Sequence, residues 1–387
     1  MKTTAIEYID APAQLAELCT RIHSAPWIAI DTEFLREKTY YPKFCLLQIA
    51  TPEWVACIDP IALPRLDELF EALYNPGIVK VLHSSRQDLE IFYQLTGKLP
   101  SPIFDTQVAA PLLGYQDNPG YAMLVSHLLN VNLNKAHTRA DWSKRPLTEE
   151  EIQYAADDVI YLCRIYQIMR DKLSALGRLD WLQPDFAELS NPALYEVLPG
   201  HAWRKIKGKN KLTGKQLSII QALAEWREST AQNENRPKGW LLRDELLFDI
   251  AKLQPETVAD LAKIRGINER TVSRYGTVLC KIIGEAKNRP PIPLHEDGRP
   301  LKKTQQQEAI VDLLTAIVRI RAEENALNPN ILATRKDLES LLFNNDDGEC
   351  LLLHGWRYSM AGKELLGILR GELLLGIKED KLEIIAR

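Results

Sequence analysis

From residue 5 to residue 113, short apolar runs alternate with segments in which apolar residues recur at a helical period. Continuous apolar runs are typical of buried strands, and a period of about 3.6 residues is typical of amphipathic helices. The apolar runs predict strands at 5–9, 27–34, 44–50, 54–59, 78–82 and 103–105. The periodic segments predict helices at 12–24, 64–74, 84–95 and 106–113. This alternation predicts an α/β fold of three layers with a mixed sheet.

The strand at 27–34 is central to the prediction because it ends abruptly in two carboxylates, Asp31 and Glu33. Side chains alternate along a strand, so residues two apart point to the same side. Two like charges at the exit of a buried strand repel, and loss of water adds to the cost. A shared cation relieves both penalties, and an all-oxygen ligand set favours Mg²⁺ or Mn²⁺ over zinc. The alternative is that both carboxylates simply point into water.

A third carboxylate, Asp88, falls in the opening turns of the helix that follows the strand at 78–82. Negative charge stabilises a helix N-terminus, so Asp88 also has a purely structural interpretation. Functional sites in such folds nevertheless lie beyond the carboxyl ends of the strands. That is where Asp88 would meet Asp31 and Glu33.

A fourth carboxylate lies on a helix whose start is marked by Thr148 and Glu151, at the spacing of a capping box. Tyr154 and Asp158 are four residues apart and share one face of this helix, whereas Asp157 points about 100° away. The apolar neighbours of Asp158 indicate a packed helix, and a buried lone carboxylate is costly unless it is paired or coordinated. We therefore interpret Asp158 as a metal ligand.

The C-terminal half is helical and internally repeated. A helix at 217–227 is followed by a second at 240–247, and the same order recurs at 313–322 and 331–342. A Pro-rich run at 289–293 predicts a stiff spacer between the two repeats. A basic segment precedes the first repeat and holds no acidic residue after Glu196; its basic residues are Arg204, Lys205, Lys207, Lys209, Lys211 and Lys215. The second repeat has an acidic loop at 344–349, which argues against phosphate binding there.

Composition is that of an ordinary globular protein: the 387 residues are 45% hydrophobic and 26% charged, enough for two or three domains. The net charge of −4 argues against a uniformly basic coat for nucleic acid but permits a local basic patch. Six scattered cysteines without a C-x-x-C pair favour reduced, buried thiols. Neither a secretory signal pattern nor an apolar stretch of transmembrane length is found, so we expect a cytoplasmic protein.

Taken together, these motifs resemble a known family. Asp31-x-Glu33, Asp88 and Tyr154-x-x-x-Asp158 resemble the three motifs of the DEDDy exonuclease superfamily. Further matches point to the ribonuclease D family within it; they are Asp31-Thr32-Glu33-Phe34, Leu46-Leu47-Gln48-Ile49, Phe104-Asp105-Thr106 and Trp142-x-x-Arg145-Pro146-Leu147. The two helical repeats look like HRDC domains, small helical modules also found in helicases.

The resemblance covers essentially the whole chain and implies a fold for each part. It implies an RNase H-like exonuclease domain, with a mixed sheet flanked by helices, followed by two small all-α HRDC domains. The boundaries expected are an exonuclease domain at 1–190, a basic linker at 191–210, a first HRDC domain at 211–290, a Pro-rich linker at 291–302 and a second HRDC domain at 303–387.

The resemblance also implies a reaction. Two divalent ions, Mg²⁺ or Mn²⁺, about 3.5–4 Å apart would assist phosphodiester hydrolysis. Their expected ligands are Asp31, Glu33, Asp88 and Asp158. We assign Tyr154 to orienting the attacking water, because a phenol is neutral at physiological pH. The expected activity is 3′→5′ hydrolysis that releases nucleoside 5′-monophosphates. The expected partner is RNA with a free 3′ end, such as a tRNA precursor, and we expect the protein to be a monomer.

Substrate contacts are less specific. Phe34 either stacks on the terminal base, as aromatic residues do in single-strand sites, or is a core aromatic. His83 either touches the terminal nucleotide or is a hydrogen-bonded structural histidine. Lys205 and Lys207 either bind phosphates or belong to a solvated linker. Two other functions stay open: a DNA 3′→5′ exonuclease of the same superfamily, since RNA choice depends on 2′-hydroxyl contacts, and a catalytically inactive nucleic-acid-binding module.

Overall fold

The computed structural model describes residues 5–133, 140–292, 303–343 and 350–387. The chain divides into two compact units. The first unit comprises Met1–Glu33, Cys45–Asn191 and Lys302–Arg387, and the second comprises Phe34–Phe44 and Pro192–Leu301. The exonuclease region and the C-terminal module, expected as separate domains, therefore form one unit.

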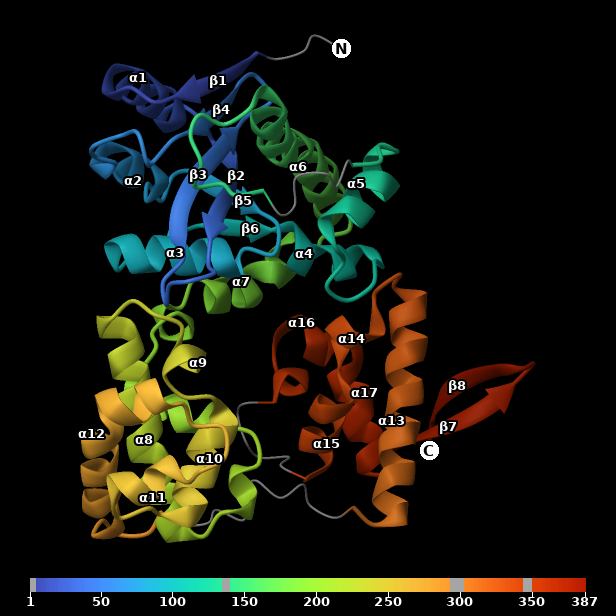
Figure 1. The fold of residues 1–387 in the computed structure, drawn as a ribbon. Coiled ribbons are helices and arrows are strands. Elements are labelled where there is room, and N and C mark those ends of the chain that lie inside the picture. Colours follow the sequence, from blue (N-terminus) through green and yellow to red (C-terminus); the bar gives the residue numbers. More distant parts are fainter. Residues whose placement is uncertain (1–4, 134–139, 293–302, 344–349) are drawn as a thin grey trace. The chain divides into compact units, whose positions relative to one another are not determined.

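A six-stranded mixed sheet forms the core of the first unit, in the order β1-β4-β3-β2-β5-β6 (Figure 1). The strands are β1 (Ile6–Ile9), β2 (Trp27–Leu35), β3 (Lys43–Ala50), β4 (Val55–Ile58), β5 (Val79–Leu82) and β6 (Ile103–Asp105). β2, β5 and β6 run parallel, and β3 is antiparallel to β4. The first four residues of β2 are buried, as its apolar run predicts. The predicted mixed sheet with flanking helices is confirmed.

Helices of the exonuclease region flank this sheet (Figure 1). The helices of this region are α1 (Pro12–His23), α2 (Asp67–Leu73), α3 (Arg86–Thr96), α4 (Thr106–Ala109), α5 (Tyr121–Leu129), α6 (Glu149–Ala175) and α7 (Gln183–Leu189), and α5 packs on α6. The helix α6 starts at Glu149 with the capping box that the sequence predicts: the Thr148 hydroxyl accepts from the Glu151 N–H, and the Glu151 carboxylate accepts from the Thr148 N–H. This cap fixes the phase of every functional side chain on α6.

The second unit is a helical module with its own core. Its helices are α8 (Gly214–Asn233), α9 (Lys238–Leu241), α10 (Asp244–Leu253), α11 (Val258–Ala262) and α12 (Glu269–Lys287). The segment 191–210, expected to be a linker, is structured here. Ile206 and Leu212 are buried in the core of the module, and Trp203 packs against it. The apolar side chains spaced among the lysines anchor this segment, so the module begins before residue 211.

The tip of the β2–β3 hairpin belongs to the same unit. The Tyr40 hydroxyl donates to the buried carboxylate of Glu228 at 2.6 Å. The backbone N–H groups of Tyr40 and Tyr41 donate to the Asn235 side-chain oxygen at 3.1 and 3.0 Å. These contacts fix the hairpin tip on α8.

The C-terminal module packs on the exonuclease region within the first unit. Its elements are α13 (Gln305–Glu324), α14 (Pro329–Leu332), α15 (Arg335–Phe343), α16 (Gly355–Arg357), α17 (Lys363–Leu369), β7 (Leu373–Lys378) and β8 (Lys381–Ala386). The buried Arg178 guanidinium donates to the Leu112 and Asn325 carbonyls, and the Trp181 and Trp356 rings stack 4.6 Å apart. The module was expected to be all-α, and the hairpin β7–β8 corrects that expectation.

Two expectations fall on residues outside the described ranges: most of the Pro-rich linker at 291–302, and the acidic loop at 344–349. Among the described helices, none combines the length and the apolar character needed to cross a membrane.

Candidate active site

Three carboxylates from two elements meet beside the C-terminal half of strand β2. Asp31 and Glu33 lie on β2 and Asp158 lies on α6, and one carboxylate oxygen from each lies within 4.8 Å of the other two. Strand alternation brings the first two to the same side, and the phase of α6 adds the third. The three can hold a metal ion, and oxygen-only donors suit Mg²⁺ or Mn²⁺.

The fourth expected carboxylate, Asp88, lies in the first turn of α3 and is only 7% exposed. One oxygen accepts a hydrogen bond from the hydroxyl of Thr32, the residue between Asp31 and Glu33. Burial, the larger cause, and repulsion from Asp31 both raise the pKa of Asp88. Asp88 is therefore close enough to Asp31 to interact electrostatically, and Thr32 fixes its position.

The electrostatics of the cluster indicate a site that lacks positive charge. Burial and repulsion by Asp31, Asp158 and Asp88 raise the pKa of Glu33 to about 9. Burial and the neighbouring Asp157 raise the pKa of Asp158 to about 7. Each shift disfavours the charged carboxylate, and a bound cation would reverse it. The donor set thus fits a divalent metal.

The face of α6 separates Asp158 from Asp157. Asp157 accepts a hydrogen bond from the exposed Gln153 at 2.8 Å and lies outside the three-carboxylate cluster. Tyr154, one turn before Asp158, is half-buried, with its ring 6.2 Å from that of Trp142. Tyr154 and Asp158 therefore share the face that the sequence predicts, and Asp157 does not.

A clamp that was not predicted holds the segment leading into α6. The guanidinium of Arg145 donates to both carboxylate oxygens of Asp59, at 2.5 and 2.8 Å, and to the Cys45 carbonyl at 2.6 Å. The Tyr8 hydroxyl donates to the same carboxylate at 2.7 Å. Although burial alone would raise it, the hydrogen bonds from Arg145 and Tyr8 hold the pKa of Asp59 at about 2. Arg145 belongs to a motif that the sequence singles out, but its partner is 86 residues away.

Tyr121 is a second residue that the sequence did not reveal. Its hydroxyl donates to the backbone carbonyl of Asp158. Burial, then repulsion by Asp158 and Asp31, raises the pKa of this phenol. Tyr121 thus ties α5 to α6 at the ligand-bearing turn.

The described contacts of His83 include those with Thr106 and Tyr121. The residue is half-buried, its Nδ1 lies 2.9 Å from the Thr106 hydroxyl, and Tyr121 packs beside it with ring centroids 5.2 Å apart. Asp105 caps α4 by accepting from the Gln107 N–H at 2.8 Å, and it also accepts from the Ser85 N–H at 2.8 Å. These residues fix the turn from which α3 presents Asp88.

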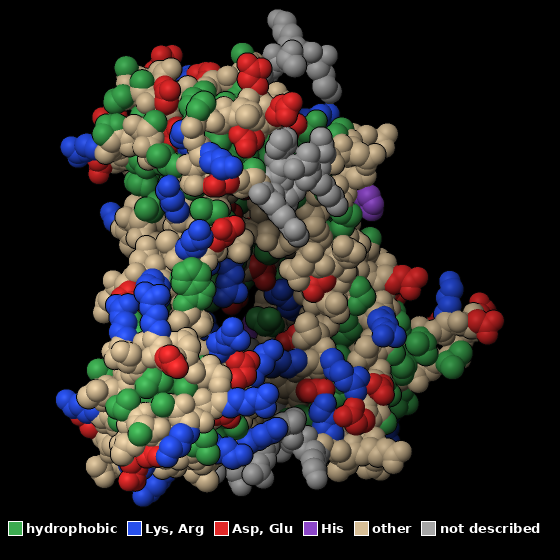
Figure 2. Space-filling model, viewed as in Figure 1, with side chains coloured by type: hydrophobic (Ala, Val, Ile, Leu, Met, Phe, Trp, Pro, Cys, Tyr) green, Lys and Arg blue, Asp and Glu red, His purple; other side chains and the backbone are tan. Residues whose placement is uncertain are grey.

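The remaining candidate substrate contacts are not brought to the cluster by any described contact. Phe34 is half-buried on β2, and strand alternation places it on the opposite face from Asp31 and Glu33. Lys205 and Lys207 are exposed on the second unit. Lys and Arg side chains gather on the visible face of that unit (Figure 2).

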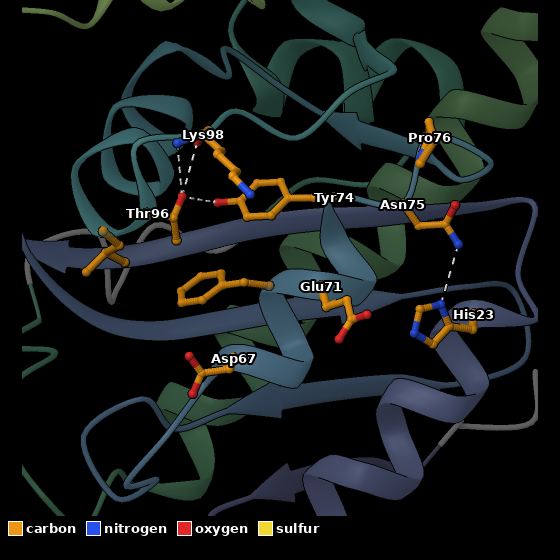
Figure 3. Close-up of a pocket in the computed structure, with 10 residues that line it drawn as sticks. His23, Asp67, Glu71, Tyr74, Asn75, Pro76, Thr96 and Lys98 are labelled. Atoms are coloured by element: carbon orange, nitrogen blue, oxygen red, sulfur yellow. Dashed lines mark hydrogen bonds between the residues drawn. The ribbon is translucent and has the colours of Figure 1, made fainter.

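A cavity of about 740 Å³ in the exonuclease region is not the catalytic site (Figure 3). It is lined by residues of α2, by His23 at the end of α1 and by Thr96 at the end of α3. Asp88 lies eight residues before Thr96 on α3, which corresponds to about 12 Å of helix. The residues that line the cavity include none of Asp31, Glu33, Asp88 and Asp158.

Comparison with known proteins agrees with this geometry. Residues 6–174 match a family model described as 3′-5′ exonuclease, and residues 216–283 match an HRDC domain model. The chain is 37% identical over 381 residues to a ribonuclease D of Granulibacter bethesdensis, covering 97% of this chain and 96% of the relative. It is also 37% identical to a ribonuclease D of Gluconacetobacter diazotrophicus, covering 95% and 94%. The crystal structure of Escherichia coli RNase D, described as an exoribonuclease involved in structured RNA processing, aligns with a TM-score of 0.82 at 29% identity, covering 95% of this chain and 99% of that one.

Proposed function

The chain belongs to the ribonuclease D family and is a metal-dependent 3′→5′ exoribonuclease; we propose that it trims the 3′ ends of structured RNAs such as tRNA precursors. The observation that carries the proposal is the meeting of Asp31, Glu33 and Asp158 within 4.8 Å, beside the buried Asp88. Uncompensated carboxylates at this density are unfavourable without cations. The similarity of this chain to Escherichia coli RNase D, which is described as an exoribonuclease involved in structured RNA processing, supports this substrate class.

The four carboxylates are the proposed ligands of two divalent ions, with Mg²⁺ and Mn²⁺ as the candidates that fit oxygen donors. Bound there, such ions supply activation of water and neutralisation of charge on the scissile phosphate. Thr32 holds Asp88 in place through its hydroxyl, and Tyr121 holds the Asp158 turn through the backbone carbonyl. The ligands are thereby positioned before substrate binds, which is the requirement for precise metal placement.

Tyr154 is proposed to orient the attacking water. It lies one helical turn before Asp158, a spacing that puts both residues on one face of α6 and supports a role beside the ligand. A positioned phenol donates or accepts a hydrogen bond at the nucleophile without becoming the final proton acceptor. This role requires the hydroxyl and not the ring.

RNA beyond the terminal nucleotides is proposed to contact the basic segment of the second unit. Six basic residues and no acidic residue occur between positions 204 and 215. Lys205, Lys207 and Lys211 are exposed, while Ile206 and Leu212 anchor the segment to the core. A fixed row of exposed ammonium groups suits a phosphate backbone, with lower entropic cost than a loose tether. The module at 303–387 is proposed to be a second, divergent HRDC domain.

The direct test is digestion of 5′-labelled RNA and DNA oligonucleotides of matched sequence, with 3′-hydroxyl or 3′-phosphate ends, with and without Mg²⁺ or Mn²⁺. We expect shortening from the 3′ end of the RNA, release of nucleoside 5′-monophosphates and no reaction in EDTA. A tRNA precursor with a 3′ extension should be shortened to its mature end. Equal or faster digestion of DNA, or release of 3′-monophosphates, contradicts the proposal.

A further inference from the structure

The hairpin β7–β8 projects from the C-terminal module (Figure 1) and exposes large apolar side chains. Ile377 is 79% exposed, and Leu374, Ile385 and Leu382 are 50%, 47% and 41% exposed. Only its base packs closely, because Leu373 lies against Gly367 of α17, where an added Cβ would come within 2.7 Å. Leucine and isoleucine side chains at such exposure favour a partner.

The hairpin forms a two-stranded sheet with no further strand among the described residues. An isolated pair of strands is at best marginally stable in water, and additional strands with a shared apolar face stabilise it. Both outer edges therefore offer unpaired backbone N–H and C=O groups. A partner that adds a strand would satisfy the backbone groups of an open edge.

The register of the hairpin defines its two faces. The cross-strand pairs Leu373–Ala386, Leu375–Ile384 and Ile377–Leu382 alternate with the other pairs, so these six apolar residues form one continuous face. The opposite face carries Leu374 opposite Ile385 near the base, Gly376 opposite Glu383, and Lys378 opposite Lys381 at the tip. Like charges directly opposite are destabilising unless an acidic group lies nearby.

The register also defines which backbone groups point outward. Glu379 and Asp380, both at positive φ, form the two-residue turn, so the flanking pair Lys378–Lys381 is the hydrogen-bonding kind. Alternation then directs the N–H and C=O groups of Leu373, Leu375 and Ile377 away from β8. These are the groups available to a new strand.

We propose that β7 pairs antiparallel with β7 of a second copy of this chain, about a two-fold axis at Leu375. In this register Leu375 lies opposite its own copy and Leu373 lies opposite Ile377 of the other chain, so the outward backbone groups meet. Glu372 lies opposite Lys378 of the other chain, and symmetry repeats this pair. The result is a four-stranded sheet with one uninterrupted apolar face.

Charge complementarity selects this partner and this register. The Glu372–Lys378 pairs place a carboxylate beside each tip lysine. Self-pairing of β8 over its full length, centred at Ile384, places Lys381 opposite Arg387 and is disfavoured. The proposed dimer interface therefore lies on β7, in contrast to the monomer expected from the sequence.

The test is sedimentation velocity of the full-length protein from low to high micromolar concentration. We expect a reversible dimer in the wild type. Glu372→Lys and Lys378→Glu each turn two attractive pairs into repulsive ones and should weaken dimerisation by about tenfold. The double variant Glu372→Lys/Lys378→Glu restores opposite charges and should recover most of the affinity. Lys336→Glu, an exposed charge reversal on α15 and not on the hairpin, is the matched control.

A second variant tests the backbone contacts without relying on charge. Leu375→Pro removes an N–H that faces away from β8, a position where a strand tolerates proline. It should abolish the dimer while leaving cleavage of a short RNA unchanged. A monomeric wild type at every concentration overturns the proposal and points to a different partner for the hairpin. A dimer that survives both single charge reversals or Leu375→Pro also overturns it.

Discussion

The Arg145–Asp59 clamp predicts that Arg145→Ala destabilises the fold around α6 without changing any residue of the carboxylate cluster. The Asp59 side chain is 2% exposed and the Arg145 side chain 22% exposed, so Arg145→Ala leaves a buried carboxylate without its cation. The pKa of Asp59 is lowered from 3.8 to about 2. Each pKa unit corresponds to about 1.4 kcal/mol, so the net stabilisation of the charged form is about 2.5 kcal/mol. Loss of one partner of a buried pair typically costs about 3–5 kcal/mol; we expect about 3.

Arg65→Ala is the matched control. Arg65 also pairs with an aspartate, Asp67 at 2.8 Å, but the two side chains are 82% and 72% exposed. Such surface pairs contribute about 0–1 kcal/mol. Native-state hydrogen exchange of β3 and β4, together with urea unfolding followed by tryptophan fluorescence, compares the two variants. A loss in Arg145→Ala no larger than in Arg65→Ala would refute the clamp.

The same pair predicts a pH dependence with a definite sign. The pKa of Asp59 is lower in the folded protein than the ordinary value of 3.8, so the folded state holds the proton less tightly. Its stabilisation is full above about pH 4 and is lost as the pH falls from about 4 to about 2. The unfolding free energy of Arg145→Ala should lose this acid-dependent component. Because Arg145 also binds the Cys45 and Trp142 carbonyls, we expect kcat to fall by about tenfold through displacement of α6.

Three further outcomes are expected. Tyr154→Phe should keep metal binding and RNA affinity but lower the single-turnover rate by about 10²-fold, and an unchanged rate would exclude Tyr154 from the mechanism. Asp31→Asn should relieve repulsion and increase the free energy of unfolding in EDTA by about 1 kcal/mol, which raises the melting temperature, and it should abolish the stabilisation by Mn²⁺; a lower melting temperature would contradict the repulsion. Lys205→Ala/Lys207→Ala should reduce the salt slope of long-RNA affinity by about 1.4, with Lys281→Ala as the exposed control; identical slopes would remove the basic segment from the binding surface.

Local patterns were sufficient for the elements that carry the ligands. The apolar run before Asp31 predicts a buried strand, and the Thr148–Glu151 spacing predicts the start of α6 to the residue. Both are determined by residues close in sequence, so the start of α6 could be placed near Glu149 without knowledge of tertiary contacts. The expected position of strand ends predicted that Asp88 meets Asp31 and Glu33, whereas the assignment of Asp158 rested on its packed helix face and on the family resemblance.

Features that depend on distant partners were missed. The Arg145–Asp59 clamp and the Thr32–Asp88 hydrogen bond join residues 86 and 56 positions apart. Nothing in the spacing of either residue identifies its partner. The basic segment was read as a linker because its lysines suggested solvation, whereas Ile206 is only 2% exposed and anchors the segment to the core. In that case a few apolar contacts outweighed the local composition.

The most direct test of the central claim is the single-turnover cleavage rate of a 3′-hydroxyl RNA oligonucleotide by Asp158→Asn and Asp157→Asn at saturating Mn²⁺. The two side chains are adjacent in sequence, but only Asp158 belongs to the three-carboxylate cluster. We predict that Asp158→Asn loses essentially all cleavage, while Asp157→Asn cleaves within about threefold of the wild type, a change of less than 1 kcal/mol. Cleavage by Asp158→Asn, or its loss in Asp157→Asn, would contradict the assignment of this carboxylate site as the catalytic metal centre.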